Sequence, residues 1–408
     1  MYAFVYDIFL RIIGFLVSIL PLKGRKITAW KTGQKQVFGR LRQHQESLQG
    51  CIWFHVASLG EFEQAKPVIE AVRKNYPNER LLLTFFSPSG YEKMKDYNDV
   101  NLVTYLPLDT KANVQAFLQI VQPKLALFAK YEYWYNYLKA LKKQNIPALL
   151  FSALFDENHL VFKWYGKPYQ KAFLAFEDIL VQDKRSFEIA SKIFQQVNIS
   201  GDTRVDRSLA LPKEAPSYSS VEHFLQNKKC LIAGSTWPAD IELLQPIPLN
   251  DWDIQLIIAP HEISTSTLES LKTIFPNSVR WSALHHDTHA QVLIIDEIGA
   301  LKYLYQYASI AYIGGGFGKG IHNTLEPAAY EIPILFGPKH ERFIEAVEMK
   351  KLGGAFSVNH PTELKEQVQT LLFDDEIYQK SAKATGDFLK QHANATKVVL
   401  TRIDKHLK

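Results

Sequence analysis

The sequence predicts an α/β protein of two doubly wound domains, each a parallel β-sheet covered by helices. Apolar runs of strand length recur along the chain, with stretches of helical periodicity between them. Several of these runs are continuously apolar instead of alternating, which is typical of strands buried on both faces. A length of 408 residues, 47% of them hydrophobic, is enough for two domains with large cores.

The expected strands form two groups. In the first half of the chain they are Ile52–Ala57, Leu81–Phe86, Asn101–Tyr105, Leu125–Phe128, Ala148–Phe151, Ile179–Val181 and Val197–Ser200. In the second half they are Cys230–Ala233, Ile254–Ala259, Val292–Ile295, Ile310–Ile313, Ile334–Phe336 and Ala355–Val358. Between the groups, residues 207–219 contain two prolines and three serines and are predicted to be the linker.

These boundaries divide the chain into four parts. Residues 1–42 form an N-terminal helix and a basic segment, 43–206 the N-terminal domain, 207–219 the linker and 220–408 the C-terminal domain, whose last helix could pack back on the N-terminal domain. Ligands of doubly wound sheets bind beyond the carboxyl ends of the strands. Two such domains joined by a hinge therefore imply a ligand cleft.

The first stretch of the chain is expected to lie on a membrane surface. It is very apolar but contains Asp7 and Arg11, and only about ten residues separate Arg11 from Pro21, about half of a spanning helix. On a helix, Asp7, Arg11, Gly14 and Ser18 would form one narrow polar stripe. An interfacial helix fits this pattern best; a helix that packs on its own domain or on a partner, and a true span, are the alternatives.

Charge placement supports that reading. Residues 22–42 carry seven lysines and arginines and no acidic residue, which suits contact with anionic headgroups on the cytoplasmic side. Residues 43–408 carry a net charge of −2, which argues against a general nucleic-acid-binding surface. The sequence has two cysteines, Cys51 and Cys230, which excludes a disulfide scaffold and a cysteine-based metal site. The segment His285-His286-Asp287-Thr288-His289 is interpreted as an exposed loop, and no metal site is expected.

The first candidate catalytic segment follows the first strand. A turn at Ser58, Leu59 and Gly60 leads into a helix predicted to begin near Glu61 or Phe62. Glu61 would lie at a strand's carboxyl end, where the helix dipole favours its ionised form, so it can serve as a general base. Alternatively, a glutamate in the first turn merely stabilises its helix.

Two further segments place charged groups after strands. FAKYEYWYN, residues 128–136, delivers Lys130 and Glu132 among aromatic residues, either as cleft groups or as a solvated surface loop. ISGDTRVDRS, residues 199–208, places Arg204 near the hinge, where a guanidinium could meet a phosphate. Alternatively, Arg204 pairs with Asp202 or Asp206 and is structural.

The glycine-rich segment at residues 312–338 gives the strongest signal. Glycines after a strand allow backbone N–H groups to approach a phosphate, and the helix opening near Asn323 would add partial positive charge. Glu326 could accept hydrogen bonds from ribose hydroxyls; a glycine-rich turn followed by a capped helix is the alternative. The residues proposed here to bind the nucleotide are Gly315, Gly316, Gly318, Lys319, Gly320, His322, Asn323, Thr324, Leu325 and Glu326. Loops from neighbouring strands add Ser235, Thr236, His261 and Gly299.

Together these segments resemble the 3-deoxy-D-manno-octulosonic acid (Kdo) transferases of lipopolysaccharide synthesis. The most specific elements are SLGE at 58–61, KYEYW at 130–134 and HNTLEPAA at 322–329, in the family's order, and the resemblance covers nearly the whole chain. It implies the GT-B fold, two Rossmann-like domains that face a cleft, with the acceptor on the N-terminal side and CMP-Kdo on the C-terminal side. It also implies a peripheral protein of the inner membrane that faces the cytoplasm.

The resemblance implies roles for individual residues. Glu61 falls at the catalytic base, with Ser58, Gly60 and Lys130 on the acceptor side, and Glu132 and Arg204 fall where the family stabilises the transition state. The family's CMP contacts fall at Pro260, His261, Ile298, Gly299, Ala300 and Asn323 through Glu326. Three features depart from the family: His261 stands where arginine is usual, Ala300 where an acidic residue is usual, and Tyr135 and Thr324 where proline is often found.

The expected reaction is inverting transfer of Kdo from CMP-Kdo to the 6′-hydroxyl of a lipid A precursor, with Glu61 as base and without a cofactor or metal ion. The expected partners are these two substrates and an anionic membrane surface. Another GT-B enzyme that uses a UDP- or GDP-sugar is the first alternative. A membrane-attached scaffold without activity is the second.

Overall fold

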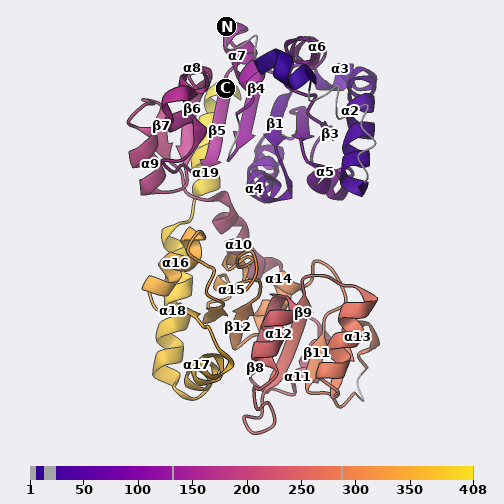
Figure 1. Cartoon of the computed structure of the whole chain (residues 1–408), viewed down its shortest axis with the longest axis vertical. Helices are drawn as coiled ribbons and strands as arrows, with labels where there is room; N and C mark the ends of the chain where they lie inside the picture. The colour runs from indigo at the N-terminus through magenta and orange to yellow at the C-terminus, as the bar shows by residue number, and fades with distance from the viewer. Residues whose placement is uncertain (1–5, 13–23, 131–132, 286–287, 408) are drawn as a thin grey trace. The chain divides into compact units, whose positions relative to one another are not determined.

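The computed structural model describes residues 6–12, 24–130, 133–285 and 288–407. The chain forms two compact units: unit 1 comprises residues 1–206 and 394–408, and unit 2 comprises residues 207–393. Each contains a seven-stranded, all-parallel sheet with helices around it (Figure 1). The two-domain α/β class predicted from the sequence is therefore confirmed.

Unit 1 has the strand order β3-β2-β1-β4-β5-β6-β7. The interior strand β1 is buried at every position, because helices cover both faces of the sheet. The strands are β1 (Ile52–Val56), β2 (Leu81–Phe85), β3 (Leu102–Tyr105), β4 (Leu125–Ala129), β5 (Ala148–Ala153), β6 (Phe176–Val181) and β7 (Val197–Ile199).

Most helices of unit 1 begin directly after a strand, and a polar side chain caps several of them. Ser58, Ser87, Thr110 and Asp183 each accept a hydrogen bond from a backbone N–H of the first turn. The helices are α2 (Arg25–Gln43), α3 (Gln45–Leu48), α4 (Leu59–Asn75), α5 (Pro88–Met94), α6 (Lys111–Val121), α7 (Tyr135–Lys143), α8 (Lys167–Phe173) and α9 (Lys184–Ala190).

The last helix, α19 (Ala395–Leu407), belongs to unit 1 and lies against α4 (Figure 1, yellow). Its Val399 and Ile403 are fully buried in the core of this unit. Asp206 caps its start, since the carboxylate accepts hydrogen bonds from the backbone N–H groups of Asn394 and Thr396, both at 2.6 Å. The chain thus returns to unit 1 after completing unit 2.

Unit 2 has the strand order β10-β11-β9-β8-β12-β13-β14. The strands are β8 (Cys230–Thr236), β9 (Gln255–Pro260), β10 (Ser278–Arg280), β11 (Val292–Ile294), β12 (Ile310–Ile313), β13 (Ile334–Phe336) and β14 (Ala355–Ser357). The helices are α11 (Ser219–Leu225), α12 (Pro238–Leu244), α13 (Thr265–Ile274), α14 (Leu301–Leu304), α15 (Leu325–Ala328), α16 (Ile344–Lys351), α17 (Pro361–Phe373) and α18 (Asp375–Gln391).

The predicted linker at 207–219 is largely helical instead. Helix α10 (Thr203–Glu214) runs through Pro212, and α11 begins at Ser219. Val205, Ser208 and Leu211 recur at a helical spacing of three and are all buried. This periodicity outweighs the backbone hydrogen bond that Pro212 removes near the helix end. The sequence analysis also did not anticipate β10, a short edge strand.

The N-terminal helical residues 6–12 dock on unit 1. The Tyr6 hydroxyl donates to the Asp109 carboxylate at 2.9 Å, and the Asp7 carboxylate, buried, accepts from the Lys111 backbone N–H at 2.7 Å. Asp7 is therefore an internal docking contact and not part of a solvent-facing stripe, while Gly14 and Ser18 lie outside the described residues. Among the described residues, no helix is both long and apolar enough to cross a bilayer.

Asp109 is the buried acceptor under this docking site. Besides Tyr6, it accepts hydrogen bonds from the backbone N–H groups of Asn136 and Tyr137, both at 3.0 Å, at the start of α7. Burial raises the pKa of the Asp109 carboxyl to about 7, although these donors oppose the shift. The folded protein thus holds a proton on Asp109 over a range where the unfolded chain does not.

Substitution Asp109→Asn tests this titration. The folded state binds the Asp109 proton more tightly than the unfolded state between about pH 4 and about pH 7, so this residue lowers the free energy of unfolding as pH rises through that window. The Asp109→Asn variant has no carboxyl group that titrates at this position. In urea unfolding, its free energy of unfolding relative to that of wild type should therefore increase between about pH 5 and about pH 8. If the difference in free energy of unfolding between variant and wild type did not change with pH, the proposed titration of Asp109 would be contradicted. Asp96→Asn, at an exposed site, is the control.

Candidate active site

Glu61 lies in the first turn of α4, which begins at Leu59, two residues before the predicted start. Ser58 is the N-cap: its hydroxyl accepts from the Gly60 backbone N–H at 3.2 Å and donates to the Glu61 carboxylate. The Ser-x-x-Glu spacing is that of a capping box. Glu61 is half-buried and is held by Ser58 at the N-terminus of the helix. The arrangement is compatible with a base and also with a helix-stabilising role.

The loops after β1, β2 and β4 meet at the carboxyl edge of this sheet. The Ser87 backbone N–H donates to the Ala57 carbonyl at 2.7 Å. The Trp134 ring lies 5.2 Å from His55 and 4.9 Å from Phe86, between ring centres. The segment KYEYW therefore approaches the Glu61 loop through its tryptophan.

Lys130 follows β4 with a left-handed backbone, φ 71°, and its N–H donates to the Phe151 carbonyl at 3.0 Å. This left-handed residue is the one at which an acceptor-side group was expected. Glu132, predicted to act in the transition state, lies outside the described residues.

Arg204 pairs with Asp202. Its Nε and Nη2 donate to the Asp202 carboxylate at 2.9 and 2.5 Å, and its backbone N–H donates to the other carboxylate oxygen at 2.9 Å. Of the two partners considered from the sequence, the structure shows Asp202, whereas Asp206 caps α19. The Arg204 side chain remains 26% exposed, so it can still meet a ligand.

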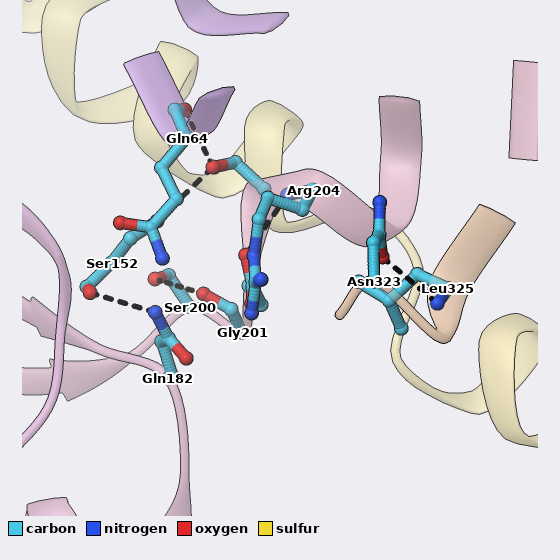
Figure 2. A network of polar contacts seen from close by, with 10 residues as sticks. Gln64, Ser152, Gln182, Ser200, Gly201, Arg204, Asn323 and Leu325 are labelled. Carbon is cyan, nitrogen blue, oxygen red and sulfur yellow. Dashed lines mark hydrogen bonds and ion pairs between the residues drawn. The ribbon is translucent and has the colours of Figure 1, made fainter. Parts of the chain in front are cut away.

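A buried network fixes the start of α10 within unit 1 (Figure 2). The Thr203 hydroxyl donates to the Gln64 carbonyl at 2.6 Å and shares a hydrogen bond with Ser152 at 3.1 Å. Gln182 donates to the Ser152 carbonyl at 2.9 Å. Gln64 lies one turn after Glu61 on α4, so the network links the helix that carries Glu61 to the helix that carries Arg204.

In unit 2, a buried carboxylate organises the carboxyl edge of the sheet. Asp240, 1% exposed, accepts from the backbone N–H of Trp237 at 2.8 Å, the Tyr312 hydroxyl at 2.8 Å and the backbone N–H of Gly315 at 2.9 Å. It thereby joins the start of α12, the strand β12 and the glycine-rich loop. The sequence analysis did not single out Asp240, although its position as third residue of a helix after Trp237-Pro238 fits a cap.

The glycines are needed for close packing, and several of their amides are already bonded. Gly315 and Gly320 have φ values of 93° and 129°, and a Cβ on Gly316 would lie 2.5 Å from Gly337. The amide of Gly315 is bonded to Asp240, and those of Gly318 and Gly320 to the Gly315 carbonyl at 2.9 and 3.2 Å. These three amides are therefore not free to cradle a phosphate, which corrects the sequence expectation for them.

The helix after this loop is short. Helix α15 has four residues, so its dipole adds little positive charge. The Asn323 side chain accepts from the Leu325 backbone N–H at 3.0 Å (Figure 2). Thr324 and Leu325 are fully buried, and Glu326 lies partly exposed in this helix.

Three rings form a compact cluster beside the loop. The His261 ring stacks on Trp237 at 4.6 Å and on His322 at 4.4 Å, and Trp237 Nε1 donates to His322 Nε2 at 3.1 Å. Burial, and then the charge on His261, lower the pKa of His322 to about 4, so His322 is neutral near pH 7. His261 is the exposed ring of the pair.

The remaining predicted donor-side residues lie on the same loops. Ser235 has a left-handed backbone, φ 56°, at the end of β8. The hydroxyls of Thr236 and Thr324 are buried without a hydrogen-bond partner. Thr236 and Pro260 line a cavity of about 480 Å³ between α12 and α13.

The loop before α14 contains the other three predicted donor-side residues, Ile298, Gly299 and Ala300. Ile298 is 87% exposed, Gly299 has a φ of 97°, and Ala300 is the buried N-cap of α14. An exposed isoleucine before such a turn is accessible to a ligand. Among the described residues, no group of three or more His, Cys, Asp or Glu side chains could hold a metal ion; His286 and Asp287 lie outside them.

Comparison with solved structures defines the class. The chain superposes on a UDP-N-acetylglucosamine 2-epimerase with a TM-score of 0.62 and 13% identity, over 88% of this chain and 96% of that one. A glycosyltransferase from Rickettsia africae gives a TM-score of 0.56 and 12% identity, over 88% and 99%. This likeness shows the fold: two parallel-sheet α/β units that resemble those of GT-B proteins.

Sequence comparison then gives the family. Residues 32–207 match the family model of 3-deoxy-D-manno-octulosonic-acid transferase (kdotransferase). The 3-deoxy-D-manno-octulosonic acid transferase of Aquifex aeolicus is 26% identical over 363 residues, which cover 85% of this chain and 94% of that protein. The Haemophilus influenzae enzyme of the same name is 26% identical, covering 87% of each chain. The chain is thus similar to Kdo transferases over most of its length, and these relatives support a glycosyltransferase.

Substitution Asp240→Ala tests the organising role of the buried carboxylate. It leaves three donors without their acceptor, so unit 2 should lose about 3 kcal/mol of stability and nucleotide binding should weaken with it. Denaturant unfolding and calorimetric titration with CMP measure the two effects. Asp251→Ala, at an exposed carboxylate of the same unit, should change neither. Equal stability of the two variants would contradict the role.

Proposed function

We propose that this chain transfers Kdo from CMP-Kdo to the 6′-hydroxyl of a lipid A precursor, with inversion at the anomeric carbon and Glu61 as general base. The observation that carries the proposal is the held, half-buried Glu61 at the carboxyl edge of unit 1, inside the segment that matches the family model. The curated relatives are named as transferases of the same sugar acid.

In the proposed reaction, Glu61 takes the proton from the acceptor hydroxyl while that oxygen attacks the anomeric carbon of Kdo. The bond from that carbon to the phosphate oxygen breaks, and CMP leaves from the opposite face. Ser58 orients the Glu61 carboxylate by donating to one of its oxygens, which leaves the other to accept the proton. A base of this kind contributes about 100- to 10,000-fold to the rate.

Negative charge grows on the departing phosphate, and we propose that Arg204 and donor-side groups of unit 2 stabilise it. The Asp202 carboxylate holds the Arg204 guanidinium in place. It also compensates part of the positive charge of Arg204. On the donor side, we propose that His261, which stacks on Trp237 and His322, contacts the nucleotide. The proposal needs no metal ion, because these side chains would neutralise the phosphate.

We further propose that the N-terminal part of the chain contacts the cytoplasmic face of the inner membrane. With Tyr6 and Asp7 turned toward unit 1, Ile8, Phe9 and Ile12 are left 39%, 58% and 51% exposed. Together with the basic helix α2, this exposed apolar face suits insertion at a surface of anionic lipid.

Nucleotide preference tests the donor. In a thermal-shift series, CMP should raise the melting temperature of the purified protein, and UDP and GDP at the same concentration should raise it less. A larger shift with UDP or GDP would point to a different GT-B reaction on a membrane lipid.

Substitution Glu61→Gln tests the base. It keeps the shape of the side chain but cannot accept the proton, so kcat should fall by at least about 100-fold while CMP affinity stays the same. The matched control is Glu63→Gln, an exposed glutamate two residues further along α4. A folded Glu61→Gln protein with near-normal turnover would remove Glu61 as the base. In the same assay, Arg204→Ala should lower kcat far more than CMP affinity; loss of affinity alone would contradict its transition-state role.

A further inference from the structure

Three cationic side chains of unit 2 line one open cavity next to the glycine-rich loop. Lys319 comes from that loop, and Lys339 and Arg342 come from the segment between β13 and α16. With Glu341 they enclose about 510 Å³. All four residues are exposed, so the cavity is open to solutes.

Lys339 is fixed against the glycine-rich loop. Its ammonium group donates to the carbonyls of Gly318 at 2.9 Å and Phe317 at 3.3 Å, and its backbone N–H donates to the Gly316 carbonyl at 3.0 Å. Carbonyl oxygens accept hydrogen bonds but do not cancel the charge. The ammonium group therefore keeps a full positive charge at a defined place.

Arg342 packs on Gly320. A Cβ at Gly320 would lie 2.7 Å from Arg342 Nη2 and 2.8 Å from the Phe343 ring, so this close approach depends on glycine. The guanidinium also lies 5.5 Å from the centre of the Phe343 ring, within range of a cation–π interaction. Both contacts restrict the side chain and position its charge beside the loop.

The cavity has an excess of positive charge. Three cations face a single carboxylate, Glu341, and among the residues that the structure describes no ion pair joins Lys319, Lys339 or Arg342 to a carboxylate. Like charges gathered around one space repel one another until an anion enters. The amides of Gly315, Gly318 and Gly320 are bonded internally, so anion binding at this loop depends on side chains.

We propose that Lys319, Lys339 and Arg342 form an oxyanion site that takes a carboxylate or phosphate group of a substrate, outside the CMP moiety. A guanidinium can grip either group with two parallel hydrogen bonds, and an ammonium group adds a point charge. The identity of the substrate rests on the proposed function. There, the donor sugar carries a carboxylate next to its anomeric carbon, and the lipid acceptor carries phosphates.

The first experiment measures anion binding without any reaction. Calorimetric titration with inorganic pyrophosphate should show binding to wild type that weakens by about tenfold in Lys339→Met and in Arg342→Met. Lys365→Met, which removes an exposed cation from α17, is the matched control and should bind as wild type does. Binding within about twofold of wild type in both cavity variants would overturn the oxyanion site.

The second experiment identifies the source of the anion by steady-state transfer with both substrates varied. If the site holds the sugar carboxylate, KM for CMP-Kdo rises in the variants while the Kd for CMP does not change. If it holds an acceptor phosphate, KM rises for the phosphorylated acceptor and not for its dephosphorylated form. Unchanged KM values for both substrates would overturn the assignment to a substrate. Pyrophosphate binding without transfer by wild type would leave the anion site in place and count against the proposed function.

Discussion

Unit 2 of this protein depends on one buried carboxylate, that of Asp240. Removing a carboxylate from water costs several kcal/mol unless hydrogen bonds compensate for it. Asp240 receives three, from Trp237, Tyr312 and Gly315. These bonds fix the start of α12 and the start of the glycine-rich loop on one strand end. The same contact places the Trp237 ring, on which His261 stacks and whose Nε1 donates to His322.

This constraint has a chemical consequence. Once Gly315 is bonded to Asp240, its carbonyl receives the amides of Gly318 and Gly320, and the loop closes on itself. A loop that satisfies its own amides gains rigidity but loses donors for a ligand. Two sets of side chains near the loop are then left to meet negative charge. They are the ring cluster of Trp237, His261 and His322, and the cations Lys319, Lys339 and Arg342. In unit 1, a helix cap likewise holds the candidate base. The Ser58 hydroxyl accepts from the backbone of the first turn of α4 and donates to the Glu61 carboxylate.

Much of this could be predicted from the sequence. Continuous apolar runs located the strands within a few residues, because burial on both faces leaves a strong signal in each run. Interactions between distant residues could not be predicted in this way. The sequence pattern predicts a polar stripe that includes Asp7, whereas in the structure Asp7 accepts a hydrogen bond from Lys111. Residues 207–214 are predicted to be a linker, whereas burial of Val205, Ser208 and Leu211 makes them helical. The glycine pattern gave the place of the loop, but not which carbonyl each amide would meet.

The central claim is the transfer reaction itself, and one assay tests it most directly. CMP-Kdo is prepared beforehand, excess EDTA is added, and the purified protein is then mixed with it and a tetra-acylated lipid A precursor. The lipid is read by mass spectrometry. The account predicts a mass gain of one or more Kdo units with EDTA present. Protein that is folded and binds CMP, yet leaves the lipid mass unchanged, would contradict it.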